Sequence, residues 1–322
     1  MSHYTVLVIG DDPEKQLAPF EESTENLERG LLEFVDEEDS YLQKYENESV
    51  EMVVMEDDSL KSPYDDIFKQ GEMFDQKYVV PEHLQKRQVP HKERFATFET
   101  FVADYQGIEE RDPDKQRYGY WRNPRAKWDW YSLGGRWTGY FRLKVNATGE
   151  TGRPGLMTKP AKTGYADQVR KKDVDVKKMR KHARKEAQEH WNEFQKVLAG
   201  RELPPRWSEV REKHGTDIEA ARKEYNSLPV VIDLNKADLM PFMGALHDRF
   251  GCTEEAFLQR AEDNALTSYA ILYNGQWYER GEMGWFGMSH NEKDPDEWSR
   301  EFAKLFDSLP DDTLLSLYDC HI

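Results

Sequence analysis

The sequence predicts an α+β fold in which helices cover an antiparallel or mixed β-sheet, with a ferredoxin-like sheet as one form of it. Three features support this: strand-like runs at both chain ends (3–10 and 311–322), a strong hairpin signal at 268–281, and capped amphipathic helices beside them. The two terminal strands are expected to be neighbours in the sheet. His3 would then lie within reach of His321.

The first third of the chain follows its opening strand with acidic segments. Asp12 has the residue type of a helix cap, and Pro13 suits the first position of a helix. The acidic residues 21–48, with apolar spacing at Leu27, Leu31, Leu32 and Val35, predict a surface helix. Residues 49–55, SVEMVVM, predict a short strand, and the mixture of acids, Pro and Lys at 56–94 predicts an irregular insertion.

The middle of the chain predicts mainly helices and one strand. In order, we expect a helix with four apolar residues on one face, a strand at 136–145, a loop at 151–167, a helix at about 168–199 that Gly200 ends, and a helix at 216–226. The four apolar residues are Phe95, Phe98, Phe101 and Val102.

The last third carries the clearest local signals. Thr253 predicts the cap of a helix, and Asn274-Gly275 predicts the turn of a hairpin. Asp294, with Glu297 three positions later, predicts a capping box. The helix that follows has an apolar face of Trp298, Phe302, Leu305 and Leu309, and a closing strand ends the chain.

These elements predict one domain over the whole chain. Its parts would be 1–20, 95–150 and 250–322. Two insertions would interrupt it, an acidic one at 21–94 and one at 151–230 that contains a basic helix and a further helical segment.

Charge is unevenly distributed along the 322 residues, whose net charge is −17. Residues 1–80 hold 22 Asp and Glu against 6 Lys and Arg, residues 81–201 hold 16 against 27, and residues 202–322 hold 24 against 12. The basic part could bind phosphate, or it could pair with the acidic part of the same chain. Internal pairing is the simpler interpretation.

Composition argues against several classes of protein. No apolar run approaches the roughly 18 residues of a membrane span, and the N-terminus lacks the pattern of a secretory signal. Cys252 and Cys320 form no C-x-x-C pattern and predict no disulfide framework. We expect a cytoplasmic protein without a membrane partner.

The segment WDWYSLGGRWTGYFRL at 128–143 gathers three Trp and three Tyr or Phe around Gly-Gly-Arg. Aromatic rings beside a cation suit a nucleotide or single-stranded nucleic acid, whereas the alternative is a core with a glycine bulge. The predicted binding residues here are Trp128, Trp130, Gly134, Gly135, Arg136 and Trp137. Phosphate contacts would come from Arg122, Arg125, Lys127, Arg136 and the basic helix at 170–185.

A second glycine-aromatic segment, WYERGEMGWFGMSH at 277–290, adds Arg280 and Trp285 as predicted binding residues. Alternatively, Arg280 forms a salt bridge with Glu279 or Glu282.

Candidate catalytic residues are Glu282, His321 and His3. Glu282 could act with His290 as acid and base, or both could join Asp319 and His321 around a metal. No spacing such as H-E-x-x-H supports a metal, so none is predicted, and the sequence identifies no cofactor. In the closing DCHI, neighbouring residues of a strand point to opposite faces, so Cys320 and His321 cannot meet each other.

The motifs WDWYSLGGRW, ERGEMGW and the closing DCHI, together with HYTVLVIGDDPEK, resemble a family of uncharacterised proteins encoded by bacteriophages and prophages. A strand followed by DDPE and a helix is also similar to plasmid-borne ferredoxin-like domains of unknown function. The first resemblance implies a phage-type accessory protein and assigns no catalytic residue. The second implies an α+β sheet.

Two functions are therefore expected. The first is a phage-type accessory protein that binds and modulates a host protein, for example as an anti-defence inhibitor, through a charged surface. The alternative is a nucleotide- or nucleic-acid-binding protein or a phosphoester-acting enzyme. In that alternative, Arg136 binds phosphate, Trp130 or Trp137 stacks on a base, and Glu282 with His321 transfers protons.

Overall fold

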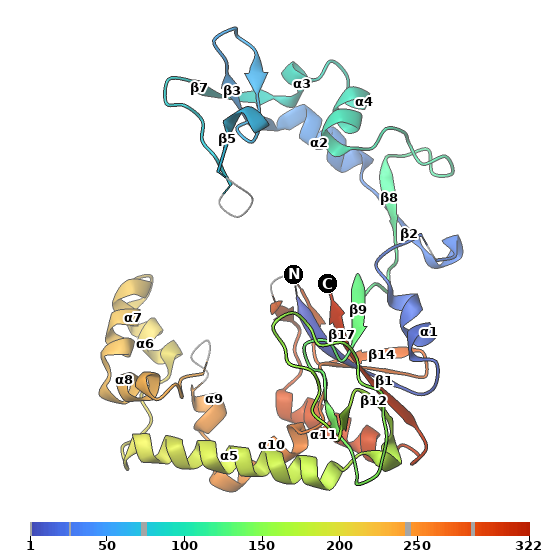
Figure 1. Ribbon diagram of the computed structural model, residues 1–322. Helices are drawn as coiled ribbons and strands as arrows, with labels where there is room; N and C mark the ends of the chain where they lie inside the picture. The colour runs from blue at the N-terminus through green and yellow to red at the C-terminus, as the bar shows by residue number, and fades with distance from the viewer. Residues whose placement is uncertain (1, 26, 72–75, 242–245, 285–286) are drawn as a thin grey trace. The chain divides into compact units, whose positions relative to one another are not determined.

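The computed structural model describes residues 2–25, 27–71, 76–241, 246–284 and 287–322 (Figure 1). The chain divides into two compact units, each described here by itself. Unit 1 comprises residues 1–21 and 127–322, and unit 2 comprises residues 22–126. The acidic insertion expected at 21–94 is shorter than this second unit, which extends to residue 126.

Unit 1 contains a six-stranded sheet. Its strands are β1 (His3–Ile9), β9 (Trp130–Leu133), β12 (Gln168–Arg170), β13 (Ala270–Tyr273), β14 (Gln276–Glu279) and β17 (Leu314–His321). Their order is β12-β17-β1-β13-β14, and β9 also pairs with β17. The β1–β13 pair is parallel and the other pairs are antiparallel, so the sheet is mixed and the predicted α+β class is confirmed.

The two terminal strands are neighbours, as predicted. They pair antiparallel along the whole of β1, and His3 lies directly opposite His321. The predicted hairpin is also present: Asn274 and Gly275 join β13 to β14 with φ of 52° and 72°. Two consecutive positive φ values are the requirement of a type I′ turn, which explains the Asn-Gly pair.

The ferredoxin-like form of the sheet is not confirmed. A ferredoxin-like sheet contains a split βαβ unit, in which another strand separates the two parallel strands. Here β1 and β13 are hydrogen-bonded to each other, and β14 lies outside β13.

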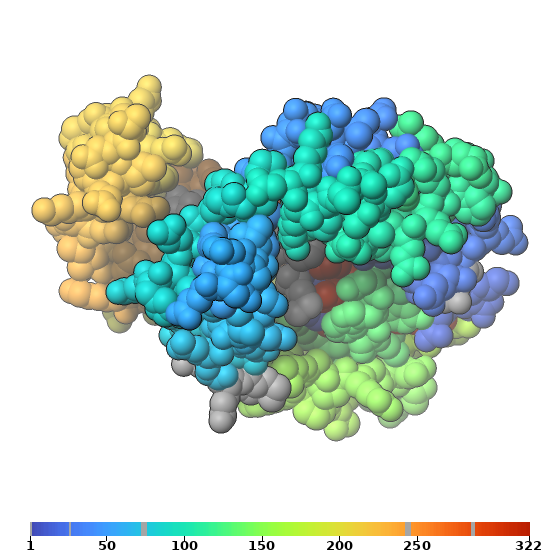
Figure 2. All heavy atoms as spheres, turned by 90° about the horizontal axis from the view of Figure 1, so that it is seen from above, coloured from blue at the N-terminus to red at the C-terminus, as the bar shows by residue number. Residues whose placement is uncertain are grey.

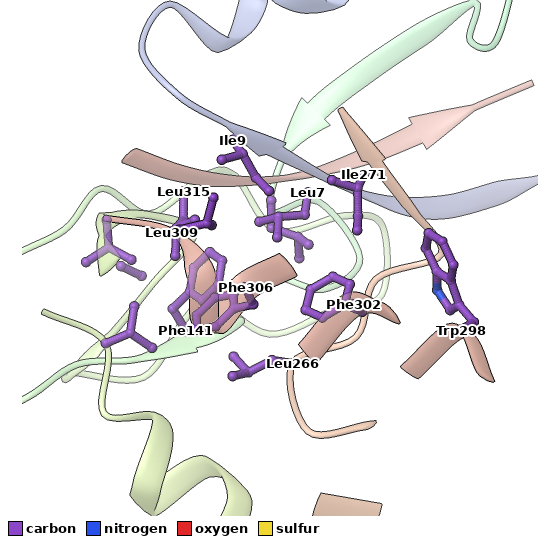
Figure 3. Close-up of a cluster of buried hydrophobic side chains, with 14 residues drawn as sticks. Leu7, Ile9, Phe141, Leu266, Ile271, Trp298, Phe302, Phe306, Leu309 and Leu315 are labelled. Carbon is purple, nitrogen blue, oxygen red and sulfur yellow. The ribbon is translucent and has the colours of Figure 1, made fainter. Parts of the chain in front are cut away.

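One face of the sheet is buried by α11 (Pro295–Ser308). Asp294 caps this helix, as predicted, because its side chain accepts hydrogen bonds from the N–H groups of Asp296 and Glu297. Aromatic side chains of α11 pack on aliphatic side chains of the strands (Figure 3). The cluster includes Trp298, Phe302 and Phe306 from the helix and Leu7, Ile9, Ile271 and Leu315 from the sheet.

The opposite face is partly covered by α1 (Pro13–Leu17) and the 3-10 turn after it. Leu17, Phe20 and Trp128 are buried there. Pro13 begins the helix, but the prediction of Asp12 as a side-chain cap is wrong. Asp12 has a left-handed φ of 53° and makes no cap hydrogen bond, since the chain must turn sharply out of β1 at this position.

The long helix α5 (Val176–Leu198) packs against α8 (Pro229–Lys236), α9 (Leu246–Phe250) and α10 (Glu254–Asn264). The predicted start at 168 is wrong, because residues 168–170 pair with β17 and Asp175 then caps the helix at the N–H of Lys178. A helix near 216–226 and the Thr253 cap are confirmed. Two further helices, α6 (Trp207–His214) and α7 (Ile218–Ser227), pack with α8 in a separate buried cluster.

Short strand pairs complete unit 1. They are β10 (Phe141–Arg142) with β11 (Tyr165–Ala166), and β15 (Glu282–Met283) with β16 (Ser289–His290). The prediction of a strand over 136–145 is therefore wrong, since only β10 forms there. Among the described residues, no helix combines the length and the apolar character that crossing a bilayer requires.

Unit 2 is a compact unit whose atoms are coloured blue to green in Figure 2. Its main sheets are β4-β3-β7 and β2-β8. The elements are β2 (Glu33–Asp36), α2 (Glu38–Asn47), β3 (Ser49–Val54), β4 (Leu60–Lys61), β5 (Lys69–Gln70), β6 (Lys77–Tyr78), β7 (Gln85–Pro90), α3 (His91–Arg94), α4 (Phe98–Phe101) and β8 (Gly119–Arg122).

Two predictions for unit 2 are wrong. Residues 21–48 do not form one helix, because residues 33–36 pair with β8 and the α-helix in this segment covers only residues 38–47. Residues 56–94 are not simply irregular, because β7 pairs with β3 over six positions. The predicted apolar face near residue 100 is confirmed: Phe95, Phe101 and Val102 are buried in the core of this unit, and Phe98 packs against it.

A half-buried ion pair in unit 2 gives a pH-dependent prediction. Glu38 accepts hydrogen bonds from Arg111 and from the N–H of Tyr118, and the bond from Arg111 is the main cause that lowers the pKa of Glu38 below its ordinary 4.5. Its stabilising contribution is therefore present above pH 4.5 and is lost as the pH falls through the lowered pKa. Glu38→Gln should destabilise unit 2 by about 1 kcal/mol at pH 7 and by much less near pH 3.

Urea unfolding at the two pH values measures this difference. Glu99→Gln is the matched control, because Glu99 also faces Arg111 but is mostly exposed. An equal loss at both pH values for Glu38→Gln would contradict the prediction.

Candidate active site

The chain ends meet at a polar end of the main sheet. Side chains alternate between the two faces along a strand, so His3 shares a face of β1 with the buried Leu7. On β17, Asp319 and His321 share that face with the buried Leu317. This face of the sheet is therefore apolar beneath α11 and becomes polar where β1 begins and β17 ends.

Each histidine is held by its own carboxylate. His3 Nδ1 lies 2.8 Å from Asp319 Oδ1, and His321 Nδ1 lies 2.6 Å from Asp129 Oδ1. A carboxylate at Nδ1 favours the tautomer in which Nδ1 carries the proton and Nε2 carries the lone pair. Within the described residues, neither Nε2 atom has a hydrogen-bond partner. Each Nε2 can therefore exchange a proton with a ligand.

The two imidazoles lie close together beside an indole. The ring centroids of His3 and His321 are 4.8 Å apart, and Trp130 stacks on His321 at 5.0 Å with 17° between the planes. His321 is only 4% exposed, whereas Trp130 is 44% exposed. The indole therefore shields His321 while much of its own surface stays open. We call His3, His321, Asp129, Asp319 and Trp130 the terminal cluster.

The GGR loop (residues 134–136) contacts the Asp319 carboxylate of the terminal cluster. The Arg136 N–H donates a hydrogen bond to Asp319 Oδ2 at 2.9 Å, so both oxygens of this buried carboxylate are engaged. Gly135 has a φ of +50°, and a Cβ built on it would lie 2.4 Å from the Asp319 Cβ. Only glycine combines that backbone angle with so close an approach.

A second buried carboxylate, Asp167, holds the chain just after the GGR loop. Gly134 has a φ of +68°, and a Cβ there would lie 2.4 Å from Asp167 Oδ2. The two glycines thus face two different aspartates. Asp167 accepts four hydrogen bonds, from the Thr138 hydroxyl and from the N–H groups of Gly139, Tyr140 and Gly152.

The close approach of Gly135 to Asp319 gives a direct prediction. Gly135→Ala should push the Asp319 carboxylate away from His3 and destabilise unit 1 by about 3 kcal/mol, from overpacking added to the unfavourable positive φ. Gly164→Ala is the matched control, because Gly164 also has a positive φ of 83° but open space around it. The control should lose only about 1 kcal/mol.

Thermal unfolding measures the destabilisation caused by Gly135→Ala, and the ring-proton NMR signals of His3 report the displacement of Asp319. Equal destabilisation by both alanine variants, with unchanged His3 signals, would show that the contact with Asp319 is unimportant.

The other predicted binding residues of the first motif differ in exposure. Trp128 is buried and its Nε1 donates to the carbonyl of Leu17, so it belongs to the core. Trp137 and the side chain of Arg136 are exposed. The ion pairs among the described residues give Arg136 no carboxylate partner. Arg136 is thus a cation whose backbone is fixed beside the terminal cluster.

Ser2, which directly precedes His3, hydrogen-bonds to the second glycine-aromatic segment (residues 277–290). The Ser2 hydroxyl donates to the carbonyl of Gly284 and accepts from the N–H of Gly287. Glu282 pairs across the β15–β16 ladder with His290 and accepts a hydrogen bond from Asn291. No contact between Glu282 and His321 is found among the described residues, so the structure does not bring this predicted acid–base pair together.

Arg280 and Trp285 have different outcomes. Arg280 forms an ion pair at 2.8 Å with Glu292, so the expected alternatives, Glu279 and Glu282, were wrong. The loop folds back so that Lys293 N–H bonds the carbonyl of Arg280, which brings Glu292 close. Trp285 lies outside the described residues.

Most of the cations predicted to bind phosphate form ion pairs with carboxylates of this chain. Arg122 pairs with Glu33 in unit 2, and Lys127 pairs with Glu279 in unit 1. In the basic run at 170–185, most cations also contact carboxylates of unit 1 or of α5 itself. The pairs are Arg170–Asp11, Lys172–Asp312, Lys178–Asp175, Arg180–Asp307, Arg184–Glu255 and Lys185–Glu189.

Cys320 lies between Asp319 and His321 but faces the opposite side of the sheet. Burial raises the pKa of its thiol well above the ordinary value, so the thiol stays protonated. Within the described ranges, no three His, Cys, Asp or Glu side chains are grouped to hold a metal ion. The chemistry that this geometry supports directly is proton transfer by two imidazoles.

Two important carboxylates were missed by the sequence analysis. Asp129 was not singled out, and its role depends on the pairing of β9 with β17, which places Trp130 opposite His321. Asp167 was assigned only to a loop. Asp129 directly precedes Trp130 in the sequence. Its contact with His321 can be predicted only when the register of β9 against β17 is known, and the strand had been expected at 136–145.

Comparisons of the chain with protein-family models, with curated proteins and with solved structures gave no significant match.

Proposed function

We propose that the terminal cluster is the active site of an enzyme that acts on a phosphoester of a nucleotide or nucleic acid. The observation that carries the proposal is the pair of His–Asp units, with imidazole centroids 4.8 Å apart. Displacement at phosphorus needs a base for the entering oxygen and an acid for the leaving oxygen. Two adjacent imidazoles, each oriented by a carboxylate, can supply both.

The reaction balances with water or a substrate hydroxyl as the nucleophile. The unprotonated Nε2 of one histidine takes the proton of the entering hydroxyl as its oxygen bonds to phosphorus. The bond from phosphorus to the leaving oxygen breaks, and the protonated Nε2 of the other histidine gives its proton to that oxygen. Asp129 and Asp319 stabilise the imidazolium form of their partners and hold the rings in place.

Two further residues suit the same substrate. Trp130 offers an exposed indole surface on which a base can stack. Arg136 offers a guanidinium to a phosphate oxygen, since the ion pairs of the described residues leave it without a carboxylate. His3 replaces Glu282 as the second proton-transfer residue beside His321, because it is His3 that contacts the His321 ring.

A panel of mononucleotides, dinucleotides and an activated phosphodiester tests this proposal. We expect turnover of at least one compound and quenching of tryptophan fluorescence by it. His3→Gln and His321→Gln should each lower turnover by about 10²–10⁴-fold but leave quenching intact. Absence of both turnover and quenching for the whole panel would rule out the proposal.

A second function, that of a phage-type accessory protein that binds a host protein, is favoured by the surface of unit 2. Residues 22–126 hold 26 Asp and Glu against 14 Lys and Arg, a balance of −12. A hollow of about 500 Å³ lies beside β3 and β4, with Met55, Ile67 and Phe68 in its lining. Tyr64 nearby is 74% exposed. Apolar side chains within an acidic surface suit a basic protein partner, such as a component of a defence system.

Removal of unit 2 tests this second function. The chain leaves unit 1 and returns to it at adjacent points, because Lys127 N–H donates to the carbonyl of Phe20 at 2.8 Å. A short glycine linker in place of residues 22–126 should therefore preserve unit 1. Loss of a host protein from a nuclease-treated pull-down would support binding by unit 2, and unchanged capture would contradict it.

A further inference from the structure

We infer that the loop at 152–162 binds single-stranded nucleic acid and presents it to the terminal cluster. This inference rests on the phosphoester function proposed above and adds the substrate class to it. It follows from where unit 1 anchors this loop, from the cations that the loop carries, and from the apolar side chains at its tip.

The 152–162 loop is anchored directly on the GGR loop. Pro154 forms a parallel bridge with Gly135, and the Gly155 N–H donates a hydrogen bond to the Gly135 carbonyl at 2.9 Å. A Cβ built on Gly155 would lie 3.0 Å from the backbone nitrogen of Arg136, and the same nitrogen donates to Asp319 Oδ2. The backbone of the loop therefore lies against the residue that contacts the terminal cluster.

Further contacts fix the loop at both of its ends. At its start, the Gly152 N–H donates to the buried Asp167 carboxylate at 2.9 Å. Near its end, a Cβ built on Gly139 would lie 3.2 Å from the Ala161 Cβ. The loop thus follows the segment 135–139 and is held in place before a ligand binds, which lowers the cost of ordering it on binding.

The loop carries three cations that the protein does not use in ion pairs. Arg153, Lys159 and Lys162 are exposed, and the ion pairs among the described residues give none of them a carboxylate partner. The same holds for Arg136. Residues 136–162 contain six Lys or Arg against one Glu, within a chain of net charge −17. A path of unpaired positive charge is what the backbone of a single strand requires.

Aromatic and apolar side chains accompany these cations. Trp130, before the GGR loop, and Trp137, after it, are 44% and 36% exposed, so two indoles offer stacking surfaces to bases. At the tip of the 152–162 loop, Leu156 is 93% exposed and Met157 is 98% exposed. Apolar side chains beside cations suit unstacked bases, which a single strand presents and a duplex does not.

An anionic membrane would also attract cations beside an apolar tip. It gives no role, however, to an indole that stacks on His321 beside a second imidazole. Nucleic acid accounts for the cations, the indoles and the proton-transfer groups together.

Binding of a fluorescein-labelled 20-residue single strand of mixed sequence tests the inference. Anisotropy is measured on full-length His321→Gln protein, so that the strand stays intact. With four phosphate contacts, the slope of the log binding constant against log salt should be about −2.8, and binding should weaken about 50-fold from 50 to 200 mM salt. The triple variant R153Q/K159Q/K162Q should reduce the slope to about −0.7 and lower the affinity at 50 mM salt about tenfold or more.

The matched control removes the same charges elsewhere in unit 1. Lys196, Arg222 and Lys223 are exposed on α5 and α7, and within the described part of the chain none of them has a carboxylate partner. The variant K196Q/R222Q/K223Q changes the net charge by the same amount. It should leave the salt slope and the affinity unchanged.

The loop tip has its own readout. Replacement of both Leu156 and Met157 by Ser should weaken binding of the strand about fivefold or more, as expected for the loss of contact with a base. Binding of an abasic strand of the same length should not change, because that strand offers phosphates without bases.

Turnover separates this inference from the function on which it rests. At 50 mM salt, kcat/KM per linkage should be about tenfold or more higher for the strand than for a dinucleotide, and R153Q/K159Q/K162Q should lose this preference. If the loop variant and the control bind and cleave the strand equally well, the inference is wrong and the phosphoester function stands. Binding to vesicles of anionic phospholipid but not to the strand would also overturn it. Loop-dependent binding of the strand without turnover of either substrate would support the binding surface and remove the phosphoester function.

Discussion

His321→Gln is expected to lower kcat on a nucleotide substrate by about 10²–10⁴-fold, the usual loss when one proton-transfer group is removed. The ring of His321 is buried, stacked on Trp130 and bonded to Asp129, so it is fixed in one orientation. Glutamine retains a polar side chain of similar length but cannot exchange a proton. His3→Gln should have an effect of similar size, since its ring is oriented in the same way by Asp319.

The pH dependence separates catalysis from folding. With one imidazole as base and the other as acid, kcat/KM of the wild type should pass through a maximum, and each variant should lose one limb of the profile. Asp129→Asn should also lower kcat, because an amide does not stabilise the imidazolium of His321. Far-UV circular dichroism and thermal unfolding show whether each variant is folded.

A matched control is available on the surface. His182 is more than half exposed and lies beside Glu186 on α5, so His182→Gln should leave both kcat and the pH profile unchanged. A loss of less than threefold for both His3→Gln and His321→Gln would exclude the terminal cluster as the active site.

The part of the fold that local signals determine could be predicted from the sequence. A run rich in β-branched residues defines β1, and a run of Leu and Tyr defines β17. Asn274-Gly275 defines the hairpin, because only that kind of residue pair tolerates two positive φ values. Asp294 and Thr253 cap their helices as their residue types suggest.

The region after Trp130 could not be predicted from local signals. Residues 136–145 alternate as a strand does, yet the chain there turns around the buried side chains of Asp167 and Asp319. These two aspartates are remote in sequence from the glycines they face. Hydrogen bonds to distant carboxylates therefore override the local pattern, and β9 forms earlier in the chain than expected.

The same reasoning applies to the site. Proximity of His3 and His321 follows from neighbouring terminal strands, which the sequence indicates. Asp129 could not be predicted, because its contact with His321 depends on the register of β9 against β17. Glu282 was paired with His321 by residue type alone, and side-chain chemistry does not determine which elements meet.

Asp167→Ala is expected to cause the largest loss of stability in unit 1. The wild-type side chain is fully buried and accepts hydrogen bonds from one hydroxyl and three backbone N–H groups. Alanine would leave these four donors without their acceptor, at about 1–3 kcal/mol for each one that water cannot reach. A total loss of at least about 4 kcal/mol is a large share of the 5–15 kcal/mol that stabilises a typical domain.

The loss of stability should be confined to unit 1, and the local structural change should be confined to the loop that Asp167 holds. Because unit 2 is a separate compact unit, only the unfolding transition of unit 1 should move to lower urea concentration. Amide hydrogen exchange at Gly139, Tyr140 and Gly152 should accelerate even under conditions in which the variant remains folded. Asp312→Ala is the matched control, since that carboxylate is exposed and forms a surface pair with Lys172. Its effect should be much smaller than that of Asp167→Ala, because an exposed ion pair contributes little to stability. If Asp167→Ala were no more destabilising than this control, the buried carboxylate could not be what holds the segment after the GGR loop in place. The position of Arg136 beside Asp319 would then need another cause.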